Sequence, residues 1–180
     1  MYGLVNKAIK EFVITHYGNE TWEETYKELE LSENQFLSME SNPDEITFQI
    51  INSICDKSGY PQKELAEQLG EYFLTFAAKE GFEDLMELSG DTLPELLQNL
   101  NNLHFRVKTL MPNLNPPRFE VSELTEHSLK LHYYSSRDGF DIFLIGVLKG
   151  LAKRFNLLVT LTQLPPVNSG EKCIILISWT

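Results

Sequence analysis

Apolar periodicity and turn residues predict an α+β fold, with a helical N-terminal lobe followed by a smaller lobe of antiparallel strands and one long helix. Apolar residues recur at helical spacing through the first two thirds of the chain. The spacing changes to alternation beyond Pro117, and residues 140–155 return to a helical pattern. The chain has 180 residues, of which 42% are hydrophobic. This is long enough and apolar enough for one domain with a core and an internal pocket.

The first helix is predicted from apolar residues at helical spacing, which are Leu4, Val5, Ala8, Ile9, Phe12 and Val13. Gly18 supplies its stop signal. Thr21-Trp22-Glu23-Glu24 matches a capping box, in which a threonine and the glutamate three residues later satisfy N–H groups at a helix start. A second helix is therefore predicted to open at Thr21.

Each of the next two helices is predicted to start at a proline. Asn42 is predicted as the N-cap and Pro43 as the first helical residue of one, and its buried face consists of Ile46, Ile50, Ile51 and Ile54. Gly59 ends that helix, and Pro61 starts the next, whose apolar side consists of Leu65, Leu69, Phe73 and Phe76.

A fifth helix carries a histidine among its apolar residues. After Gly81 and Gly90, Asp91 can cap this helix, and one stripe contains Leu93, Leu97, Leu100, His104 and Val107. The helix is predicted to end at Met111-Pro112, because proline cannot continue a helix.

The C-terminal third is predicted to alternate between strands and one helix. Leu129, Leu131 and Tyr133 alternate with polar neighbours, as a strand with one buried face requires. Residues 140–155 form the long helix, and residues 157–162 and 173–179 form two further strands.

Charge and composition exclude several classes of protein. A net charge of −11 and an isoelectric point near 4.8 disfavour nucleic acid and anionic lipid as partners, because both require a basic surface. No apolar run approaches the ~20 residues of a membrane span, and the start lacks the features of a signal peptide, so a cytoplasmic protein is expected. Cys55 and Cys173 are expected as free thiols, with one disulfide as the alternative.

Two groups of residues could carry chemistry. His104 lies on the apolar face of its helix, where a neutral imidazole can ligate a metal. If the strand through Tyr133 stays extended, Tyr133, Ser135 and Arg137 share one face and present two hydroxyls and a guanidinium to carboxylates. We call these three residues the carboxylate clamp. A buried imidazole opposite such a clamp is what a protein needs to hold haem by its iron and its propionates.

Each group also has a purely structural interpretation. His104 could be a core histidine with satisfied hydrogen bonds, and Arg137 could pair with a carboxylate of the protein. The other histidines are weaker candidates, because His16 lies at a helix end, His127 in a turn and His132 on the solvent face of its strand. No multi-histidine spacing or phosphate-binding glycine loop is present, so an enzyme is not expected.

Taken together, these segments resemble the haem nitric oxide/oxygen-binding (H-NOX) family, which includes the haem domain of soluble guanylate cyclase. The resemblance spans the chain in order and is carried by Met1-Tyr2-Gly3-Leu4-Val5-Asn6, Asn99-Leu100-Asn101-Asn102-Leu103-His104, Pro116-Pro117 and His132-Tyr133-Tyr134-Ser135-Ser136-Arg137. It implies one domain over residues 1–180, divided into a distal helical subdomain (1–60) and a proximal subdomain (61–180) that holds the histidine helix and the sheet.

The resemblance also implies a cofactor, ferrous haem b buried between the two lobes, with His104 as the proximal iron ligand. The carboxylate clamp would hydrogen-bond the propionates, and Pro117 would press on the porphyrin. The distal pocket is expected from Val5, Ile9, Phe73, Leu74, Ile142, Phe143 and Leu144. Tyr72 is expected to point elsewhere, since a helix turns it about 100° from Phe73.

The distal pocket predicts which gas the protein binds. In O₂-binding members of the family that this chain resembles, a distal tyrosine donates a hydrogen bond to the gas. The matching residues here, 140–145, include no tyrosine. A pocket without a hydrogen-bond donor favours NO, and also CO, over O₂, whose bound form carries negative charge. The family resemblance implies that NO releases His104 and that the lobes then rotate. The expected partner is a histidine kinase, a cyclic-di-GMP enzyme or a cyclase. The alternatives are a haem protein that binds O₂ and a helical interaction domain without a cofactor.

Overall fold

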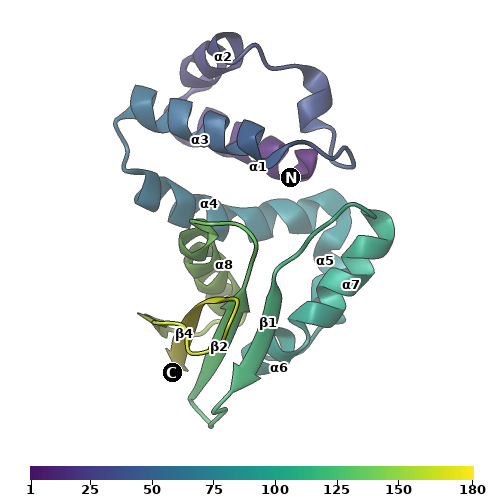
Figure 1. Ribbon diagram of the computed structural model, residues 1–180, viewed down its shortest axis with the longest axis vertical. Coiled ribbons are helices and arrows are strands. Elements are labelled where there is room, and N and C mark those ends of the chain that lie inside the picture. Colours follow the sequence, from purple (N-terminus) through teal and green to yellow (C-terminus); the bar gives the residue numbers. More distant parts are fainter.

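A computed structural model describes every residue from Met1 to Thr180 and confirms the predicted α+β class (Figure 1). The N-terminal lobe consists of α1 (Gly3–Tyr17), α2 (Asn19–Glu28), the 3₁₀ helix η1 (Glu33–Phe36) and α3 (Asp44–Ser58). Its apolar cluster is completed by Leu65 and Leu69 of α4 (Gln62–Ala77), the helix that crosses the middle of the molecule. The next lobe therefore begins with a helix that also belongs to the first core.

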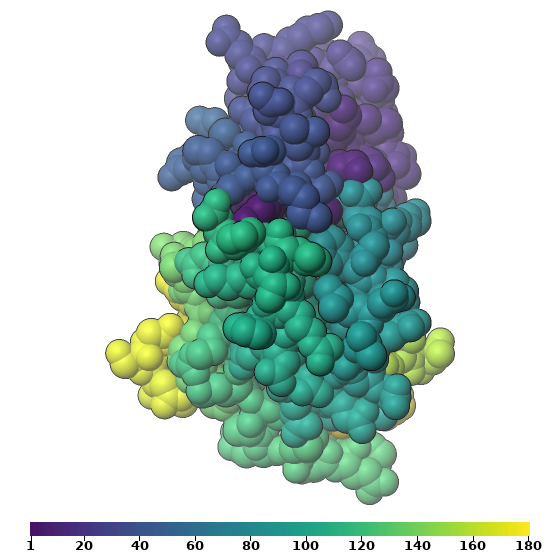
Figure 2. All heavy atoms as spheres, turned by 90° about the vertical axis from the view of Figure 1, so that its right-hand side faces the viewer, coloured from purple at the N-terminus to yellow at the C-terminus, as the bar shows by residue number.

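Beyond α4, the second lobe continues with further helical segments. The π-helical segment η2 (Ala78–Phe82) contains Gly81, whose φ of 97° kinks the chain into α5 (Glu83–Glu87). α6 (Leu93–Gln98) and α7 (Leu100–Leu110) follow. The space-filling view in Figure 2 shows the N-terminal lobe stacked on this part of the molecule, with the teal segment covering much of the face below it.

A four-stranded antiparallel sheet completes the second lobe. Its strands are β1 (Arg118–Ser122), β2 (Ser128–Tyr134), β3 (Val159–Leu164) and β4 (Glu171–Trp179), in the spatial order β1-β2-β4-β3. The inner face of the sheet packs on α8 (Phe140–Arg154), which crosses α4. β1 was not predicted, because its five residues are few and follow directly on two prolines.

Three predicted helix starts are wrong. α2 begins at Asn19, and the Thr21 hydroxyl donates to the Tyr17 carbonyl (3.0 Å) instead of capping. α3 begins at Asp44, so Pro43 is the N-cap residue rather than the first helical one. Thr92, not Asp91, caps α6 by accepting the N–H of Glu95.

The predicted fifth helix is divided into α6 and α7 at Asn99. The Asn99 side chain donates to the Ser89 carbonyl (3.0 Å), and its backbone leaves helical geometry at ψ 3°. Asparagine offers the chain such local alternatives to a helix, so the break turns the segment that carries His104 away from α6. No helix of the molecule has the length and apolar character that crossing a bilayer requires.

Candidate functional site

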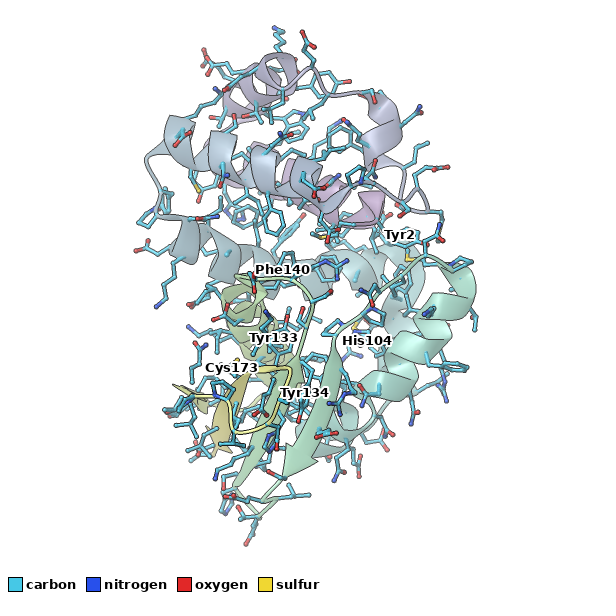
Figure 3. All side chains as sticks on the ribbon, in the orientation of Figure 1. Tyr2, His104, Tyr133, Tyr134, Phe140 and Cys173 are labelled. Carbon is cyan, nitrogen blue, oxygen red and sulfur yellow. The ribbon has the colours of Figure 1, made fainter.

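A cavity of about 310 Å³ lies between α4, α7, α8 and the first two strands, and 23 of its 31 lining residues are hydrophobic. We call it the His104 cavity. Figure 3 shows His104 on α7 and Tyr133 on β2 at opposite sides of this region, with Phe140 and Tyr2 nearer the N-terminal lobe. Its size and apolar lining are typical of a small-molecule or cofactor site.

His104 reaches this cavity uncharged. Its Nδ1 atom is buried and has no hydrogen-bond partner. Burial penalises the imidazolium and lowers the pKa of His104 from 6.5 to about 4, and the backbone of Pro117 opposes this only in part. The interpretation of His104 as a core histidine with satisfied hydrogen bonds is therefore wrong. A neutral imidazole with a free nitrogen is the form that ligates a metal.

The helix around His104 has few protein neighbours. None of the residues of α7 is fully buried, although Leu100, Leu103 and Val107 line the His104 cavity. The helix is tied to the sheet by Asn101, whose amide donates to the Phe119 carbonyl (2.7 Å) and accepts its N–H (3.0 Å). The sequence offered no sign of this tie, because it joins a helical side chain to a strand that was not predicted.

The three residues of the carboxylate clamp all line the same cavity, but not by the predicted route. β2 ends at Tyr134, so Ser135 and Arg137 follow the strand instead of continuing its face. The N–H of Arg137 donates to the Ser135 hydroxyl (3.0 Å), and this turn directs the chain back toward the cavity. Burial raises the pKa of the Tyr133 hydroxyl, which remains a neutral donor.

Arg137 also pairs with a protein carboxylate, as its structural interpretation predicts. Its Nε donates to Asp44 (2.6 Å) and its Nη1 to the Asn115 carbonyl (2.8 Å), and Nη2 is 3.5 Å from Asp44. Burial alone would raise the pKa of Asp44, but hydrogen bonds from Arg137 and the Met1 amine lower it. Three of the five guanidinium N–H groups are engaged in this way, which leaves two for a ligand.

The predicted distal residues are divided between two cavities. Val5, Phe73, Leu74, Phe143 and Leu144 line the His104 cavity. Ile9 and Ile142 instead line a neighbouring apolar cavity of about 240 Å³, which we call the Ile9 cavity. The residues common to both are Val5, Phe73, Phe140 and Phe143. Phe140 was not predicted as a lining residue, although helical spacing places it next to Phe143 and Leu144.

Three tyrosines lie in or near the His104 cavity, and Tyr72 points away from it as predicted. Tyr72 lies outside the His104 cavity, where its ring packs on Phe12 and its hydroxyl is 3.4 Å from Glu11. Tyr133 and Tyr2 do line the cavity. The Tyr2 oxygen accepts the N–H of Asn113 (2.9 Å), which places it beside the segment that follows α7. Pro117 lines the cavity as well.

Comparison with known sequences finds one matching family and several similar proteins. The sequence model of the haem-NO-binding family matches residues 2–163. The chain is 29% identical to soluble guanylate cyclase gcy-31 of Caenorhabditis elegans over 153 residues, which are 85% of this chain and 22% of the relative. It is 28% identical to gcy-33 of the same organism, covering 86% of this chain and 16% of the relative. The chain thus spans about a fifth of the length of these curated relatives.

Solved structures share the fold. An H-NOX protein from S. oneidensis in the Fe(II) state, a triple mutant, superposes with a TM-score of 0.90 at 17% identity, covering all of this chain and 96% of the other. The unliganded Fe(II) H-NOX protein from K. algicida gives a TM-score of 0.83 at 20% identity, with coverage of 100% and 97%. At these identities the superpositions establish the fold.

Proposed function

Because the chain belongs to the haem-NO-binding (H-NOX) family, whose domains are haem-binding gas sensors, we propose that it senses nitric oxide at ferrous haem b and excludes O₂. His104 carries this proposal. Its buried imidazole is neutral, one ring nitrogen has no partner, and it lies on the wall of an apolar cavity. His104 would hold the iron of a bound haem through its imidazole, and the haem would supply an iron that can bind a diatomic gas.

The carboxylate clamp supports haem b as the cofactor. Haem has apolar faces and two propionates on one edge. The cavity likewise combines a mostly apolar lining with the polar side chains of the carboxylate clamp. Tyr133 and Ser135 contribute hydroxyls, and Arg137 retains two N–H donors while Asp44 holds its guanidinium in place. Pro117 is proposed to contact the porphyrin, since it lines the cavity next to His104.

The exclusion of O₂ is supported by the side chains proposed to face the gas. Val5, Phe73, Leu74, Phe143 and Leu144 have no hydrogen-bond donor, and Tyr72 faces away. Bound O₂ becomes negatively charged and gains most from a donor, whereas NO and CO gain little. We therefore propose that this pocket discriminates by withholding a hydrogen bond. Of the seven predicted distal residues, Ile9 and Ile142 are proposed to act only from the neighbouring cavity.

The output is proposed to pass through α7. A change at the His104 ring would act directly on this helix, which has no fully buried residue and is joined to the sheet through Asn101. The curated relatives are guanylate cyclases of which the chain covers about a fifth. A cyclase, a histidine kinase or a cyclic-di-GMP enzyme is therefore the proposed partner, and the domain itself is proposed to be non-catalytic.

One set of absorption spectra tests the proposal. The ferrous protein should bind NO and CO with shifts of its Soret band and should not change its spectrum when exposed to air. Replacing His104 with Gly should remove the axial ligand, and added imidazole should restore it. A stable complex with O₂ would overturn the exclusion of O₂, and a colourless protein would overturn the haem assignment.

A further inference from the structure

A partly buried chain of three polar side chains lies on the sheet face opposite the His104 cavity. The Ser122 hydroxyl is 2.7 Å from Nε2 of His132, and Nδ1 of His132 is 2.6 Å from Glu171. The Glu171 side chain is 0% exposed and that of His132 is 12% exposed. His132 lies on the predicted outer face of its strand, but neighbouring side chains cover most of it. No role described so far uses these residues.

The carboxylate of Glu171 is fully occupied. Its second oxygen accepts the N–H groups of Val167 (2.6 Å) and Asn168 (3.0 Å), which hold the loop before β4. The order serine, histidine, carboxylate also occurs in hydrolases. None of the three residues lines one of the three main cavities. Their position in the sheet points to another role.

The pairing of β2 with β4 is irregular where the carboxylate clamp begins. Tyr133 pairs with Cys173, but Tyr134 pairs with Glu171, so Lys172 is the extra residue of a bulge. A bulge disrupts the ladder locally, and strand ends open easily. The chain that carries Ser135 and Arg137 leaves the sheet at this weak point. Backbone pairing alone therefore gives these side chains little support.

We infer that His132 and Glu171 are positioning residues for the carboxylate clamp, holding the end of β2 so that Tyr133 and Ser135 keep their places at the cavity. This inference rests on the proposed function, since the clamp is there assigned to the propionates. His132 directly precedes Tyr133, and Glu171 lies directly opposite Tyr134 in the ladder. The buried pair thus joins the two strands across the bulge.

A second contact at the bulge contributes less. Lys172 pairs with Asp138 just beyond the clamp, but the Asp138 side chain is 93% exposed, and such ion pairs stabilise little. Glu171, by contrast, is buried. If His132 were replaced by an apolar residue, the Glu171 carboxylate would lose the only side chain that hydrogen-bonds it. His132 and Glu171 therefore contribute the main positioning effect.

The transfer of haem from the holoprotein to apomyoglobin tests this assignment. His132→Leu should raise the haem dissociation rate about tenfold, the lower end of the effect of outer-shell partners at metal sites. His132→Asn, whose amide can still donate to Glu171, should recover most of the loss. Glu171→Gln, which keeps the shape of the side chain, should give an intermediate rate and serves if His132→Leu fails to fold.

Two control variants separate positioning from stability. Lys130→Ala removes an ion pair with Glu123 on the same strand face (2.7 Å) and should leave haem loss unchanged. Ile175→Val shortens a fully buried residue of β4 and lowers global stability without touching the bulge. If haem loss from His132→Leu merely tracks stability as in Ile175→Val, the inference is overturned.

Amide hydrogen exchange of the haem-free protein provides a readout that does not depend on the cofactor. His132→Leu should speed exchange at residues 133–137 selectively, and unchanged exchange there would also overturn the inference. If the wild-type protein takes up no haem, the proposed function fails, and this exchange measurement alone decides whether His132 holds the end of β2.

Discussion

Phe140 lies at the boundary of the His104 and Ile9 cavities, where one side chain can change the chemistry offered to a gas. The sequence indicates the correct stretch, residues 140–145, because it is the start of an apolar helix. It could not select Phe140 over Ile142, because the two differ only in the direction they take from α8. That direction depends on how α8 packs against α4.

Phe140→Tyr should create an O₂-binding protein. The added hydroxyl would enter the part of the cavity wall that Phe140 shares with Val5, Phe73 and Phe143, and would stabilise the negative charge on bound O₂ by about 1 kcal/mol or more. The absorption spectrum of the ferrous variant in air should show an O₂ complex. Ile142→Tyr is the matched control, because Ile142 lines only the Ile9 cavity. An O₂ complex in the control but not in Phe140→Tyr would contradict this assignment.

The pKa of His104 predicts how the stability of the haem-free protein depends on pH. The pKa is about 4 in the folded protein and 6.5 in the unfolded chain, so between these values the unfolded chain binds more protons. The free energy of unfolding should therefore rise from pH 4 to pH 6.5, by on the order of 3 kcal/mol from this group. In urea titrations, His104→Leu should lack this rise. Parallel curves for the two proteins would show that His104 is not buried as described.

The crossing of α4 and α8 depends on glycines that let the two backbones approach. A Cβ atom at Gly146 would lie 1.9 Å from the Glu67 carbonyl oxygen, which is backbone and cannot move aside. At Gly150 the nearest atom would be the Leu74 methyl at 2.8 Å, the end of a flexible side chain. Sequence periodicity predicted both helices, but close contacts of this kind arise only once the helices are packed.

Gly146→Ala should therefore be much more destabilising than Gly150→Ala. The first substitution forces α4 and α8 apart and should cost about 3 kcal/mol or more of unfolding free energy. The second should be within about 1 kcal/mol of wild type, because alanine's higher helix propensity offsets a small repacking. Chemical denaturation of both variants measures this difference. Similar losses would contradict the described crossing.

At the level of the whole molecule, α4 joins the two lobes. Leu65 and Leu69 complete the N-terminal core, whereas Phe76 packs with Tyr2, Leu4 and Ala8 nearer the His104 cavity. Two ion pairs add to this connection, one between Glu80 and Lys7 (2.7 Å) and one between Arg137 and Asp44 (2.6 Å). These contacts are partly exposed, so burial along α4 holds the lobes more strongly than the ion pairs.

A fragment of residues 1–60 should not keep the helical structure that a fragment of residues 1–80 retains. The shorter fragment lacks Leu65 and Leu69, which are 0% and 3% exposed in the intact protein, and so loses one wall of its core. Far-ultraviolet circular dichroism and urea titration should give the longer fragment more helix per residue and a cooperative transition. Equal helicity would favour residue 60 as an independent boundary.

The sequence alone was sufficient for the α+β class, for the apolar stripe that carries His104 and for the residue types of the carboxylate clamp. These features are periodic or local, so they can be read within one element. The tertiary structure decided that α7 separates from α6, that Ser135 and Arg137 reach the cavity through a turn, and that Phe140 rather than Ile142 lines it. It also brought Asp44 to Arg137 and Glu171 to His132. Such pairs are far apart in sequence, and their contact exists only through the packing of whole elements.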